Sequence, residues 1–88
     1  MGRKVADRIL VELIEADVEI GFRLVDEAKA YLLSGHPEFS IRVLQVAEDV
    51  VADIQRRLQR LGQSESWPFD PLVNELRDEI AAAGREAS

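Results

Sequence analysis

A three-residue turn, Gly35-His36-Pro37, separates two long stretches with helical periodicity and constrains the fold more than any other feature. Gly35 suits the left-handed backbone conformation that closes a helix. Pro37 suits the first position of the next helix, because its missing N–H would have no partner there. Apolar residues recur at intervals of three and four on both sides of the turn. The sequence therefore predicts two antiparallel helices joined by a short turn.

The first helix is predicted over residues 4–34 and carries two neighbouring apolar stripes. The first stripe consists of Leu10, Leu13, Ile14, Gly21, Leu24, Ala28 and Tyr31. The second stripe consists of Val11, Val18, Phe22 and Val25. Together they are wider than the apolar face of a simple surface helix, so this helix should have two neighbours. Because glycine is costly inside a helix, Gly21 predicts a close approach by another helix, with a local bend as the alternative.

The second helix is predicted over residues 37–61 and the third over residues 70–83. The 3.6-residue period of the second persists for longer than any strand would, despite its β-branched residues. Asp70 and Pro71 give the third helix a capping carboxylate and a proline at its first position. Residues 84–88 are expected to fray. Residues 1–88 are thus predicted to form one all-α domain, a long antiparallel helical hairpin closed by a shorter third helix in a three-helix bundle.

Two further positions carry structural expectations. Trp67 lies in the linker before the third helix and is expected to be buried against the hairpin. Asp17 falls within the first apolar stripe, where a buried carboxylate needs a partner. Arg57 borders the apolar face of the second helix and is a candidate partner, as is an arginine from a second chain.

The spacing around the turn resembles one tetratricopeptide (TPR) repeat. The residues that carry this resemblance are Leu24, Ala28, Tyr31, Gly35, Ser40, Leu44 and Ala47. The sequence departs from the family pattern in having no second copy, and in having Ala52 where the family ends its unit with proline. Such a resemblance implies a TPR-like helical hairpin that binds other proteins.

Composition narrows the function classes. The chain has 88 residues, a formal net charge of −6 and no cysteine, so it excludes disulfides, thiolate metal sites and cysteine nucleophiles. The net charge disfavours nucleic acid as a partner. No apolar run is long enough to span a bilayer, and no signal-type segment follows the charged N-terminus, so we expect no membrane association and a cytoplasmic location.

No residue constellation predicts catalysis. His36 is the only histidine and is expected to be a capping or surface residue. The sequence therefore predicts a protein that is not an enzyme and has no cofactor. The alternatives that stay open are a small acidic regulatory partner of the antitoxin kind, and a ligand- or metal-binding helical bundle that uses Asp17.

The expected function is a protein–protein interaction or assembly module. The excess apolar width of the first helix predicts a homodimer, or binding to another protein, because a small domain gains core by association. The residues expected at this contact are Val11, Val18, Phe22 and Val25, with Asp17 beside them.

Overall fold

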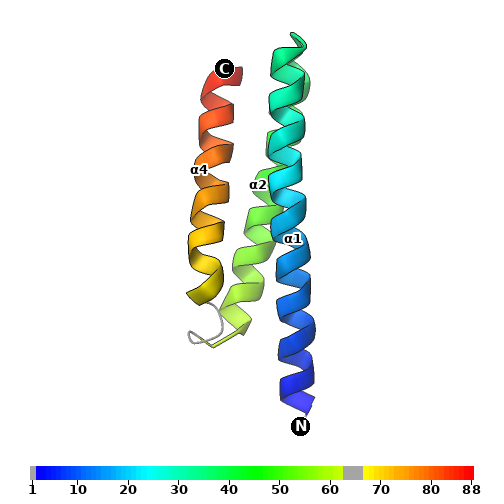
Figure 1. Cartoon of the computed structure of the whole chain (residues 1–88), viewed down its shortest axis with the longest axis vertical. Helices are drawn as coiled ribbons and strands as arrows, with labels where there is room; N and C mark the ends of the chain where they lie inside the picture. Colours follow the sequence, from blue (N-terminus) through cyan, green and yellow to red (C-terminus); the bar gives the residue numbers. More distant parts are fainter. Residues whose placement is uncertain (1, 63–66) are drawn as a thin grey trace.

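Three long helices lie side by side in an elongated bundle (Figure 1). The computed structural model describes the backbone of residues 2–62 and 67–88, and the side chains of residues 7–62 and 68–88. The elements are α1 (Gly2–Leu33), α2 (Pro37–Arg60), a short 3₁₀ helix η1 (Trp67–Phe69) and α4 (Asp70–Ala87). The bundle measures 52 × 17 × 14 Å. The predicted all-α fold, a long hairpin with a shorter third helix packed along it, is confirmed.

The turn between α1 and α2 has the backbone conformation that its glycine and proline favour. Gly35 has a φ of 79°, in the left-handed region. The His36 N–H donates to the Tyr31 carbonyl at 2.8 Å, and the Gly35 N–H donates to the Leu32 carbonyl at 3.1 Å. These two bonds satisfy carbonyls at the end of α1 in the Schellman pattern. Pro37 begins α2, and Glu38 lies in its first turn.

The core lies along the axis of the bundle, and each helix contributes one row of buried residues to it. α1 contributes Ile14, Val18, Val25 and Ala28; α2 contributes Leu44, Ala47, Val51 and Ile54; α4 contributes Val73, Leu76, Ile80 and Ala83. In the rows of α2 and α4 the residues recur at intervals of three and four, and in α1 buried Gly21 completes the same spacing between Val18 and Val25. This spacing keeps each row on one side of its helix. Ser40 is also fully buried, and its hydroxyl has no hydrogen-bond partner among the described residues.

At Gly21, a side chain of α4 approaches the backbone of α1 closely. A Cβ atom built on Gly21 would lie 2.5 Å from Cδ2 of Leu76 and 3.3 Å from its Cδ1. Leu76 is fully buried, so its side chain fills the space that the glycine leaves. The predicted approach of another helix is therefore present, and it is made by a leucine side chain of α4.

The C-terminal helix extends farther than the sequence predicts. The predicted fraying of residues 84–88 is wrong, because α4 continues through Gly84 to Ala87. Ala83 is buried and Ala87 is half-buried, so packing against the bundle supports this last turn. The predicted burial of Trp67 lies outside the side chains that the structure describes.

Candidate functional site

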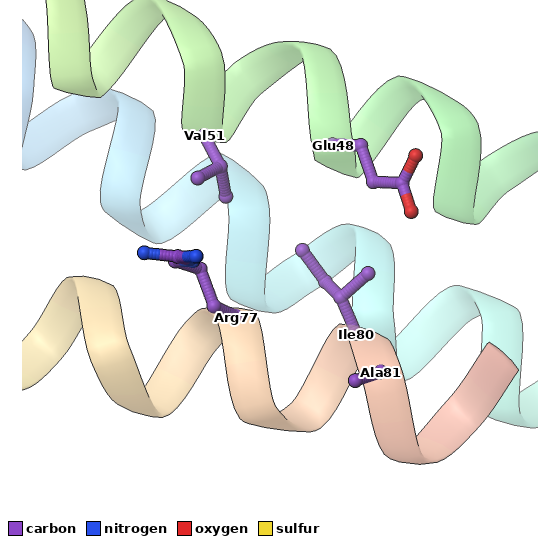
Figure 2. A pocket seen from close by; sticks show the side chains of 5 residues that line it. All are labelled: Glu48, Val51, Arg77, Ile80 and Ala81. Atoms are coloured by element: carbon purple, nitrogen blue, oxygen red, sulfur yellow. The ribbon is translucent and has the colours of Figure 1, made fainter. Parts of the chain in front are cut away.

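A shallow groove between α2 and α4 is the first candidate site (Figure 2). Its cavity volume is about 180 Å³. Val51 of α2 and Ile80 of α4 form an apolar floor, and Glu48 and Arg77 stand at its sides. The floor belongs to the hydrophobic core, since Val51 and Ile80 are both buried. The groove is therefore the seam between two packed helices.

Side chains that could act in catalysis or bind a metal do not cluster in the described part of the chain. No group of three or more histidine, aspartate or glutamate side chains there could hold a metal ion. His36 lies at the hairpin turn, where its Nδ1 is 3.4 Å from Oε1 of Glu38 and its ring lies against Phe39. The hydrogen bond from its own backbone N–H first, and then the contact with His36, hold the pKa of Glu38 below its usual range.

Among the described residues, no helix has both the length and the apolar character needed to cross a membrane.

In the part of the chain that the structure describes, one ion pair joins the two helices of the hairpin. Arg57 of α2 donates a hydrogen bond to the carboxylate of Asp17 on α1. The side chains are 32% and 21% exposed, so the pair is partly shielded from water. The predicted pairing of Asp17 with Arg57 is confirmed, and it is made within one chain. A second pair, Asp53 with Arg56, is more exposed and joins residues three apart on α2.

We expect a double-mutant cycle to separate these two pairs. For Asp17→Ala and Arg57→Ala, the coupling free energy should be about 1–2 kcal/mol, because either single change leaves a partly buried charge without its partner. For Asp53→Ala and Arg56→Ala it should be below about 0.5 kcal/mol, since exposed pairs contribute little. Urea unfolding of the single and double variants measures both quantities. Equal coupling in the two cycles would contradict this distinction.

The residues expected at a dimer contact need correction. Val18 and Val25 are 6% and 0% exposed within a single chain, so they are core residues. Val11 and Phe22 are half-buried and pack against the same core. Lys29 lies two turns after Phe22 on the same side of α1, and its Nζ is 3.3 Å from Oε1 of Glu79 on α4. The second stripe therefore faces α4 where the two helices run side by side, and Val18 and Val25 are buried within a single chain.

Eight large apolar side chains among the described residues remain exposed, and four of them lie away from the second stripe on one side of the hairpin. Ile9, Leu13 and Ile20 on α1 are 53%, 44% and 44% exposed, and Val46 on α2 is 51% exposed. We call these four residues the open face. Leu13 and Ile20 lie one turn to either side of Asp17, and Val46 lies three turns before Arg57. The Asp17–Arg57 ion pair is therefore part of this face.

The open face is directed away from α4. Ile20 precedes Lys29 by nine residues, or about two and a half helical turns, so the two side chains point to opposite sides of α1. Val46 precedes Val51 by five residues, which is about 140° around α2. Since Lys29 contacts α4 and Val51 lines the groove beside α4, the open face lies on the other side of the hairpin.

Sequence reasoning missed Ile9 and Ile20 and placed Leu13 with the core. The signal that could have found them is their spacing. Together with exposed Ala16, they recur at intervals of four, three and four, which is the seam pattern of a helix that packs on another helix.

Comparison of the chain with protein-family models, with curated proteins and with solved structures finds no match.

Proposed function

We propose that this protein is a small, non-catalytic protein–protein interaction or assembly module that works through its open face. The observation that carries the proposal is the row of exposed Ile9, Leu13 and Ile20 on α1, with exposed Val46 on α2 farther along the same side of the hairpin. Exposed apolar side chains gathered along one side of a small domain are typical of an interaction site. The partly exposed Asp17–Arg57 pair within it adds a polar element that can orient a partner.

The packing of the hairpin is compatible with this role. Ala28, Leu44 and Ala47, which carry the resemblance to a TPR repeat, are all buried where the two helices meet. That family binds other proteins, and the resemblance supports the same class of function here.

The homodimer expected from the width of α1 is also part of the proposal. Its contact is now proposed to be the open face instead of the second stripe. A cytoplasmic location also remains part of the proposal.

Site-specific photo-crosslinking in living cells tests the proposal. A photoreactive amino acid at position 20 should form a covalent adduct with one defined protein, either this chain or another, identified by mass spectrometry. The matched control is the same amino acid at Leu72, which is 41% exposed on α4, compared with 44% for Ile20. Adducts of equal amount and identity at both positions, or none at position 20, would contradict an interaction through the open face.

A further inference from the structure

We draw no further inference here: the strongest candidate, the open face on the side of the α1–α2 hairpin away from α4, carries nothing beyond the proposed function, because nothing in the structure shows what covers it.

Discussion

Gly21→Ala is expected to lower the free energy of unfolding by about 1–3 kcal/mol, although alanine is the better helix former. The added Cβ would lie 2.5 Å from Cδ2 of Leu76, so this fully buried side chain must shift, and a close-packed core resists such a shift. Gly84→Ala is the matched control, because no atom lies within 4 Å of a Cβ built there. That change should raise stability by up to about 1 kcal/mol. Denaturant unfolding of the two variants compares them directly.

A second substitution shows whether the overlap with Leu76 is the cause. Leu76→Ala alone should cost about 2–5 kcal/mol, since it empties a fully buried position. Combined with Gly21→Ala it should cost less than the sum of the two, because the new methyl group occupies part of the space that the leucine left. Additive losses would mean that the two residues do not share this space, and a Gly21→Ala protein as stable as Gly84→Ala would contradict the close contact.

Leu44→Ala is expected to cost about 2–4 kcal/mol. Leu44 is 5% exposed and lies in the buried row of α2, so truncation leaves a cavity between the two helices of the hairpin. Ile41→Ala on the same helix is the control, since Ile41 is 41% exposed. It should cost less than about 1 kcal/mol. Thermal or urea unfolding measures both, and a loss below about 0.5 kcal/mol for Leu44→Ala would place this residue outside the core.

The hairpin could be predicted from the sequence because its signals are local. The left-handed glycine, the proline at the start of α2 and the 3.6-residue period each act over a few neighbouring residues. The Asp17–Arg57 pair was also predictable, because a carboxylate in an apolar stripe needs a partner and Arg57 borders the facing stripe.

The side on which α4 packs could not be predicted in the same way. Periodicity shows how wide the apolar surface of α1 is, but it does not say which part a third helix covers. Val18 and Val25 therefore fitted a dimer contact and a core equally well in sequence, although they pack in the core. The end of α4 was missed because residues near a terminus tend to fray, whereas buried Ala83 and half-buried Ala87 hold this last turn against the bundle.

Because α1 extends beyond the end of α2, binding of a partner would change how well ordered the N-terminal part of α1 is. From Asp17, α1 extends fifteen residues toward Gly2, whereas α2 extends only three residues beyond Arg57. The N-terminal part of α1 therefore projects past the other helices (Figure 1). Backbone amides with few tertiary neighbours open at low free energy, so hydrogen exchange should slow along α1 from Asp7 toward Asp17. Ile9 lies on this projection, and a partner that packs on it would add protection from exchange where the isolated chain has little of its own.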